Sequence, residues 1–178
     1  MKSTHKLPDD SVLHIDNINY HYMDSYTATF EDKNDTITLE VVGKSFFKSG
    51  PSWIGRLFAL RNKIVSLFGL KIPETSQDHQ KQLDNFRLEP GNRLGLFNVF
   101  YVSEKEVVLG EDDKHLNFRV SLILNNHQSK AHSKTLTIST TVFYNNFLGR
   151  LYFIPVRPFH KLIVSTMMRS TIKNLEQA

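Results

Sequence analysis

The chain has 178 residues, enough for one domain that buries about two-thirds of its unfolded surface without disulfides or structural metal. It contains no cysteine, which excludes disulfides, thiolate nucleophiles and cysteine-ligated metal centres. The net charge of +4 comes from 22 basic and 18 acidic residues that are interspersed, so no basic block marks a phosphate-tracking surface and we expect no nucleic-acid partner.

No targeting or membrane-spanning segment is visible in the sequence. The charged first ten residues are not followed by the apolar stretch of a secretory signal. The two most apolar stretches, 53–70 and 147–163, are interrupted by arginine or lysine before the roughly twenty apolar residues that a bilayer crossing needs. We therefore expect a cytoplasmic protein, which the absence of cysteine also fits.

The first strand signal covers Ser25 to Phe30, where tyrosine, threonine and phenylalanine alternate. Residues 1–24 before it are interpreted as an N-terminal extension, and 25–178 as a single domain. Asp35 or Thr36 can cap a helix that begins near Ile37.

The clearest helix signal follows the break at Gly50-Pro51-Ser52. Apolar residues then recur every three or four positions and make one stripe: Trp53, Leu57, Leu60, Ile64 and Leu67. Gly69 ends this helix, and the polar segment 73–82 is predicted to be a loop.

From residue 96 the hydrophobic period changes to two, which is typical of strands. Strands are predicted over 96–102, 106–109, 115–124 and 136–144, and turns or loops over 110–114 and 125–133. In the third strand, even-numbered apolar residues from Leu116 to Leu124 share one face, while His115, Arg119 and Ser121 share the other. Strands joined by short turns should pair antiparallel.

The last segment, from Phe147 to about Leu175, has apolar residues at helical spacing and contains Pro155 and Pro158. Each proline deletes a backbone hydrogen bond and clashes with the preceding turn, so we expect a kinked helix or two helices that meet there. Early helices, central strands and a long terminal helix predict an α+β domain.

Several strings of unlike residue types carry a resemblance to a known family. They are Pro51-Ser52-Trp53, the run from Gly110 to Val120, Gly149-Arg150-Leu151-Tyr152, and the run from Pro158 to Ile163. With these segments the chain resembles the DUF2867 family, which groups bacterial domains of unknown function.

The resemblance implies a helix-grip fold similar to START-like (SRPBCC) and polyketide-cyclase domains. In that fold a curved antiparallel sheet grips the long, proline-kinked C-terminal helix and leaves an apolar cavity between them. Some relatives carry this domain behind a nucleotide-binding domain. Here no Gly-x-Gly-x-x-Gly motif follows a predicted strand, so we expect no dinucleotide cofactor, and no other cofactor is indicated.

Five residues are candidates for a ligand site: Asp113, His115, Arg119, His160 and Trp53. Asp113 can orient the His115 imidazole for acid–base chemistry while Arg119 holds an oxyanion. The alternative is a solvated turn beside the wet face of an amphipathic strand. His160 can point into the cavity or be a hydrogen-bonded structural residue, and Trp53 can line the cavity or pack in the core.

No metal site is predicted, because the eight histidines are scattered and His127 with His132 has no third partner at a familiar spacing. Two functions stay open: binding of a small hydrophobic molecule, such as a lipid, quinone or polyketide-like compound, or a cyclase, isomerase or dehydratase acting on such a molecule. An enzyme needs at least two titratable groups that meet in the cavity. Membrane contact through Trp53 to Lys71 is the less favoured hypothesis, because the sheet can cover that stripe. Catalytic residues and the oligomeric state stay open.

Overall fold

The computed structural model describes residues 1–14, 19–50, 87–94, 97–127 and 129–177. Its elements in chain order are β1 (Lys2–Thr4), the 3-10 helix η1 (Val12–His14), β2 (Tyr22–Glu31), α1 (Leu39–Lys48), β3 (Arg93–Leu94), β4 (Phe97–Val102), β5 (Glu106–Asp112), β6 (Leu116–Asn126), β7 (Ser133–Tyr144) and α4 (Phe147–Glu176). The helix predicted over 53–67, the loop over 73–82 and the candidate Trp53 lie outside the described residues.

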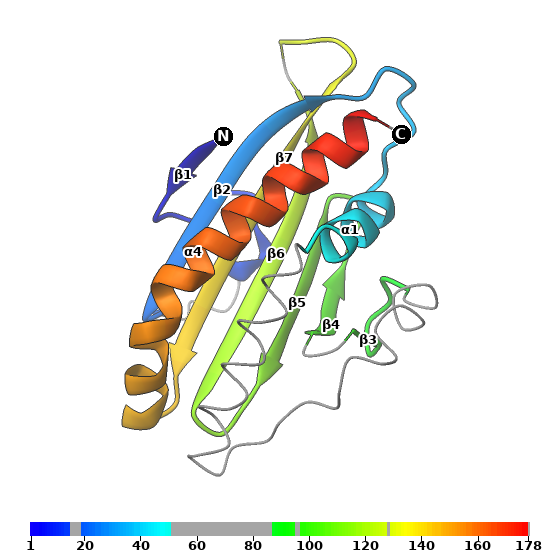
Figure 1. Cartoon of the computed structure of the whole chain (residues 1–178). Helices are drawn as coiled ribbons and strands as arrows, with labels where there is room; N and C mark the ends of the chain where they lie inside the picture. Colours follow the sequence, from blue (N-terminus) through cyan, green and yellow to red (C-terminus); the bar gives the residue numbers. More distant parts are fainter. Residues whose placement is uncertain (15–18, 51–86, 95–96, 128, 178) are drawn as a thin grey trace.

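The strands of the described chain form one antiparallel sheet in the order β1-β2-β7-β6-β5-β4-β3. Figure 1 shows α4 running across one face of this sheet, with α1 beside its C-terminal half. We call this face the inner face and the opposite one the outer face. The arrangement is the predicted α+β fold, a curved antiparallel sheet that grips a long C-terminal helix.

Period-two alternation gives the sheet two different faces. The inner face holds the main core, in which large aliphatic side chains of the central strands pack against α4. Its largest fully buried members are Phe30, Leu109, Leu122, Leu136, Ile138 and Met168. Each such side chain stabilises the fold by roughly 1.5–3 kcal/mol when it leaves water. On the outer face, small hydroxyl residues dominate the centre, among them Ser25, Ser121 and Ser139.

The N-terminal residues pack onto the outer face. β1 pairs with β2, and Leu7 and Leu13 are buried in a small cluster with Val108 of β5. The buried carboxylate of Glu106 accepts a hydrogen bond from the Ser11 hydroxyl, Oγ to Oε1, at 2.8 Å. Residues of the predicted N-terminal extension are therefore part of the folded sheet.

The start of α1 differs from the prediction. Its N-cap is Thr38, whose Oγ1 accepts a hydrogen bond from the backbone N–H of Val41, and not Asp35 or Thr36. Asp35 has a φ of 50°, in the left-handed region, so it forms a turn before the helix. The backbone N–H of Thr36 donates a hydrogen bond to the carboxylate of Asp32. Thr36 is therefore already held in the turn before the helix begins.

The turn between β5 and β6 is shorter than predicted. Residues Gly110 to Asp112 continue β5, because each has a register partner on β6. The turn is closed by the backbone N–H of Asp113, which donates to the carbonyl oxygen of Leu116. Polar composition alone does not separate a turn from the end of an exposed strand.

α4 is one continuous helix of 30 residues rather than two. Figure 1 shows that it changes direction in its N-terminal part, the part that contains Pro155 and Pro158, as the predicted kink requires. Its N-cap is Asn146, whose Oδ1 accepts the backbone N–H of Gly149 at 3.1 Å.

Two glycines permit very close backbone contacts. A Cβ atom at Gly149 would lie 1.9 Å from the carbonyl oxygen of His115, and one at Gly110 would lie 2.1 Å from that of Phe118. Neither contact leaves room for a side chain. Both glycines belong to the segments that carry the family resemblance, so part of that pattern reflects packing.

Gly149→Ala should lower the free energy of unfolding by about 1–3 kcal/mol, because α4 must shift away from the His115 carbonyl. This loss outweighs the gain in helix propensity of about 1 kcal/mol. Urea denaturation measures it. Gly50→Ala is the control, since a Cβ there meets nothing within 4 Å. Equal stability of the two variants would contradict the proposed packing role of Gly149.

Candidate functional site

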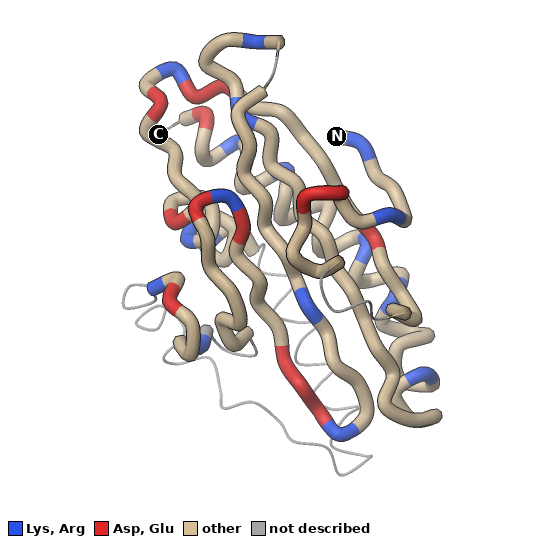
Figure 2. Tube along the Cα trace, turned by 180° about the vertical axis from the view of Figure 1, so that it is seen from behind, with Lys and Arg blue, Asp and Glu red and all other residues tan. Residues whose placement is uncertain are grey.

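Arg119 lies on the outer face, away from α4, with Gly110 and Thr141 as its register partners. Its guanidinium forms a two-bond ion pair with Asp112, with Nη1 to Oδ1 at 2.8 Å and Nη2 to Oδ2 at 3.1 Å, and lies 3.7 Å from the ring centroid of Phe100. Figure 2, which views this face, shows the acidic end of β5 beside a basic position on β6. The structure does not bring Arg119 together with His160.

Asp113 and His115 lie in the turn beneath the start of α4. The buried His115 ring packs edge-on against Tyr152, with 5.3 Å between centroids. Its Nδ1 is 3.4 Å from Oδ1 of Asp113, within ion-pair distance but without hydrogen-bond alignment. The Asn145 amide donates to the carbonyl oxygen of Asp113 at 2.6 Å, and that of Asn146 to a neighbouring carbonyl. These contacts anchor the start of α4 to the β5–β6 turn.

His160 lies on the side of α4 that faces β2. Its Nε2 is 3.4 Å from Oδ1 of Asp24, a carboxylate that is only 2% exposed. The hydroxyl of Tyr22 donates to the other oxygen, Oδ2, at 2.5 Å. Tyr26 follows on the same inner face, and its phenol helps to lower the pKa of this carboxylate. A histidine, a buried carboxylate and two phenols thus meet between the sheet and α4.

The electrostatics of this site favour an ionised carboxylate. Burial by itself would raise the pKa of Asp24, but the hydrogen bond and charge of His160, with the two tyrosine hydroxyls, hold the pKa below its ordinary value. Burial and the adjacent carboxylate raise the pKa of Tyr26 to about 12 and also raise the pKa of Tyr22. At neutral pH both phenols therefore stay protonated, and Tyr22 donates its hydrogen bond to Asp24.

Thr140 adds a polar group without a partner. It is the register partner of Asp24 on β7, so the two side chains stand next to each other on the inner face. The residue is 3% exposed, and within the described chain its Oγ1 makes no hydrogen bond. We call the group of Tyr22, Asp24, Tyr26, Thr140 and His160 the Asp24 cluster.

Aromatic and cationic side chains enclose the cluster on the α4 side. The rings of Tyr22 and Phe153 are tilted, with centroids 4.9 Å apart, and the guanidinium of Arg157 lies 5.2 Å from the Tyr22 centroid. Because Asp24 and Thr140 are almost fully buried, the electrostatic interactions within the Asp24 cluster are stronger than in water.

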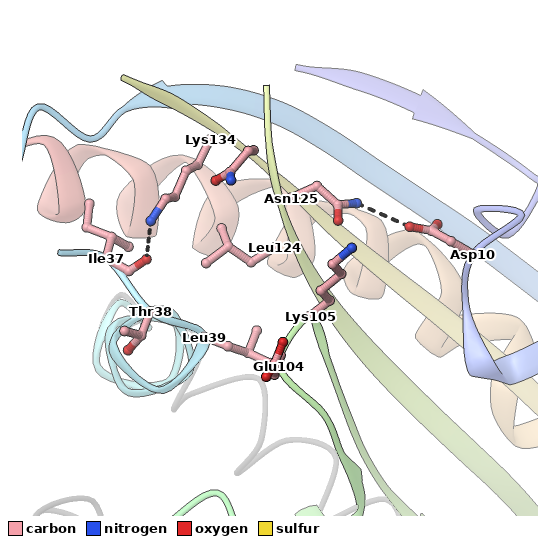
Figure 3. A pocket seen from close by; sticks show the side chains of 10 residues that line it. Asp10, Ile37, Thr38, Leu39, Glu104, Lys105, Leu124, Asn125 and Lys134 are labelled. Atoms are coloured by element: carbon pink, nitrogen blue, oxygen red, sulfur yellow. Dashed lines mark hydrogen bonds between the residues drawn. The ribbon is translucent and has the colours of Figure 1, made fainter. Parts of the chain in front are cut away.

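A separate pocket of about 590 Å³ lies at the other end of β6 (Figure 3). Ile37, Leu39 and Leu124 form its apolar part. Two of its polar side chains are already paired: Lys134 with Asp32 and Asp35, and Asn125 with Asp10, as Figure 3 shows for the last pair. Glu104 and Lys105 also line this pocket, but none of its described residues has a buried polar atom without a partner, so the Asp24 cluster is the stronger candidate site.

The sequence matches a known protein family over most of the chain. A family model described as "Protein of unknown function (DUF2867)" matches residues 18–167. The chain belongs to the DUF2867 family. No curated protein matches it in sequence. A crystal structure of a conserved protein from Geobacillus kaustophilus is similar to the DUF2867 chain with a TM-score of 0.38 and 10% sequence identity, over 86% of this chain and 94% of that one.

Two further features of the DUF2867 domain concern metals and membranes. Among the residues that the structure describes, no group of three or more histidine, cysteine or acidic side chains could hold a metal ion. Within the same ranges, no helix combines the length and the apolar composition that a membrane crossing requires.

His160 was predicted as a site residue from the sequence, but its partners in the Asp24 cluster were not. The strand predicted over Ser25 to Phe30 is β2, which begins at Tyr22 rather than Ser25, so Asp24 fell outside the predicted strand. A signal was present: Tyr22, Asp24 and Tyr26 have the same parity as the core residue Phe30, which places an acid among aromatics on the buried face. Thr140 gave no signal, because a threonine in a strand is ordinary.

Asp24→Asn should lower the free energy of unfolding at neutral pH by about 2 kcal/mol or more, because the donors lose a charged acceptor. The pKa of Asp24 is lower in the folded chain than in the unfolded chain. The contribution of ionised Asp24 to the free energy of unfolding is therefore complete when the pH is above the ordinary pKa of an aspartate. This contribution is lost as the pH falls through the lower pKa that Asp24 has in the folded chain. Urea denaturation over a pH series should show a constant gap between wild type and variant above about pH 5 that closes below it.

Glu40→Gln is the control for this experiment. Glu40 also has a lowered pKa, because Lys44 hydrogen-bonds to it, but the pair is exposed. We expect a far smaller loss of stability from this substitution. A gap for Asp24→Asn that stayed open in acid would show that Asp24 is not the ionised centre of the cluster.

Proposed function

We propose that this DUF2867 domain binds a small, largely apolar molecule between the sheet and α4, with one polar group of the ligand at the Asp24 cluster. The observation that carries the proposal is the Thr140 hydroxyl, which is buried without a partner beside a carboxylate that already has two hydrogen-bond partners, Tyr22 and His160. A lipid, quinone or polyketide-like compound fits this description. A ligand of this kind also accords with the START-like fold that the sequence resemblance implies.

Energetics support a ligand partner for Thr140. An unpaired buried hydroxyl costs about 1–3 kcal/mol, and valine has nearly the same shape without this cost. A carbonyl or hydroxyl oxygen of the ligand could accept a hydrogen bond from the Thr140 hydroxyl. This bond would remove the cost of the unpaired hydroxyl in the bound state. The cost in the free protein is therefore offset when the ligand binds.

The charge of the cluster defines the class of polar group. Asp24 is ionised, and its hydrogen bonds with His160 and Tyr22 already satisfy it. A ligand carboxylate next to Thr140 would meet this negative charge at short range. Neutral carbonyl or hydroxyl compounds are therefore preferred to fatty-acid anions.

Native mass spectrometry of the purified chain with hexadecanol, a naphthoquinone and palmitate tests the proposal. We expect complexes with at least one neutral compound and weaker binding of palmitate. Thr140→Val should weaken that complex about tenfold, the equivalent of one lost hydrogen bond. Thr141→Val is the matched control, because Thr141 is adjacent, buried and equally unpaired in the described chain but lies on the outer face.

Both valine variants should be at least as stable as wild type, because each removes an unpaired hydroxyl. A loss of binding in the Thr140 variant therefore cannot arise from unfolding. If both variants bound alike, or if no compound bound, the Asp24 cluster would be a structural polar core.

An enzyme that transfers a proton on the same kind of ligand is the second candidate function. The observation in its favour is that two titratable groups, Asp24 and His160, meet between the sheet and α4. If the Nε2–H group of His160 donates a hydrogen bond to Asp24, the Nδ1 atom carries no proton. Nδ1 can then take a proton from a ligand carbon that lies next to a carbonyl.

Incubation of a bound carbonyl compound with the protein in heavy water separates the two functions. An enzyme should introduce deuterium into the compound, detected by mass spectrometry, and His160→Gln should stop the exchange while the complex still forms. A pure binding protein should leave the compound unchanged with either chain.

A further inference from the structure

The N-terminal half of α4 exposes a continuous row of large apolar side chains. The exposed residues are Phe147 (74%), Leu148 (52%), Leu151 (47%), Ile154 (64%), Phe159 (46%) and Leu162 (52%). They are six of the ten exposed large hydrophobic residues in the described chain. We call them the α4 ridge.

Helical spacing places the ridge on the side of α4 opposite the sheet. Leu148, Leu151, Phe159 and Leu162 are separated by three, eight and three residues, which keeps them on one side of the helix. The other side buries Gly149, Phe153 and Val164. A helix that is apolar on both sides is normally covered on both. In α4 the sheet covers one of them.

Three cations lie on one flank of α4, next to the ridge, and one of them, Arg157, also lies over the ring of Tyr22. Arg150, Arg157 and Lys161 are separated by seven and four residues, so they share one flank of the helix. None of them forms an ion pair with a carboxylate in the described part of the chain. The single acidic residue of α4 is Glu176, at its C-terminal end.

We propose that the α4 ridge docks on an anionic lipid surface, with the helix axis in the plane of the membrane. Apolar residues on one side and flanking cations without acidic neighbours are the pattern by which helices bind such surfaces. Leu151 and Ile154 would enter the acyl boundary to a depth of about 5–10 Å, and Arg150 and Lys161 would meet the phosphate groups.

Charge complementarity favours lipid over a second copy of the chain. Two α4 ridges in contact would bring two sets of unpaired cations to one interface, where like charges oppose association. A purely apolar partner would account for the ridge but not for its cationic flank. An anionic bilayer satisfies both features.

Vesicle flotation of the full chain tests this inference. The wild type should float with phosphatidylcholine vesicles that contain phosphatidylglycerol and much less with pure phosphatidylcholine, and high salt should weaken binding. Arg150→Gln with Lys161→Gln should weaken binding about thirtyfold, at about 1 kcal/mol for each cation. Lys33→Gln with Lys105→Gln removes the same charge at exposed sites outside α4 and should have a much smaller effect.

Leu151→Ser with Ile154→Ser should abolish flotation, and Val41→Ser with Tyr101→Ser, at residues of similar exposure elsewhere, should not. Because the chain has no cysteine, Leu151→Cys also accepts a single environment-sensitive fluorophore. Its emission should shift to the blue on addition of the anionic vesicles, whereas the same label at Val41→Cys should not respond. This measurement does not depend on the stability of the serine variants.

Two results would overturn the inference. One is that the wild-type protein does not float with excess anionic vesicles at low salt and that the emission of the fluorophore on the Leu151→Cys variant does not shift under the same conditions. The other is a dimer in solution that dissociates in the Leu151→Ser, Ile154→Ser variant, since the ridge would then be the interface with a second copy.

Discussion

Backbone contact between Gly149 and the carbonyl oxygen of His115 brings the start of α4 directly onto the β5–β6 turn. Asn145 and Asn146 fasten the same junction through side-chain hydrogen bonds to the turn carbonyls. From this point α4 crosses the inner face, so the contact determines which helical residues meet which strand. His160 reaches Asp24 because the helix begins here.

Two of the buried carboxylates in the described part of the chain, Glu106 and Asp24, lie on opposite faces of the sheet, and their surroundings differ in kind. Glu106, on the outer face, accepts hydrogen bonds from Ser11, Ser121 and the backbone of Val12, all of them neutral groups of fixed position. These donors tie the N-terminal segment to the sheet, which is a structural task. Asp24 is instead held by a titratable histidine and by phenols, with an unpaired hydroxyl alongside.

This difference is the reason to place function at the Asp24 cluster. The donors to Glu106 are neutral groups of the N-terminal segment and of β6, whereas Asp24 is held by an imidazole and a phenol from two of the elements that form the core, α4 and β2. An unpaired hydroxyl in the same cluster leaves one interaction to be made. The proposed site therefore depends on chemistry that the Glu106 site lacks.

α4 takes part in both proposals through different sides. Its sheet-facing side carries His160 and the core residues, and its outward side carries the α4 ridge. The two sides make independent predictions, because the ridge variants leave the Asp24 cluster untouched. Prolines within the helix allow the N-terminal part to take its own direction.

The sequence by itself determined the α+β class, the antiparallel strands and the long kinked helix. Each of these follows from local periodicity and from the backbone chemistry of proline, which need no knowledge of distant residues. The family resemblance rested on segments around Gly110 and Gly149, where backbone packing restricts the choice of residue.

Only the tertiary structure decided the composition of the candidate site. Asp24 and His160 are 136 residues apart in the chain and meet because β2 lies beneath the middle of α4. Arg119 and His160, which the sequence allowed to share a cavity, lie on different sides of the sheet. Strand parity says which residues share a face, but which face the helix covers is decided by long-range packing, and so is the neighbour that each side chain meets.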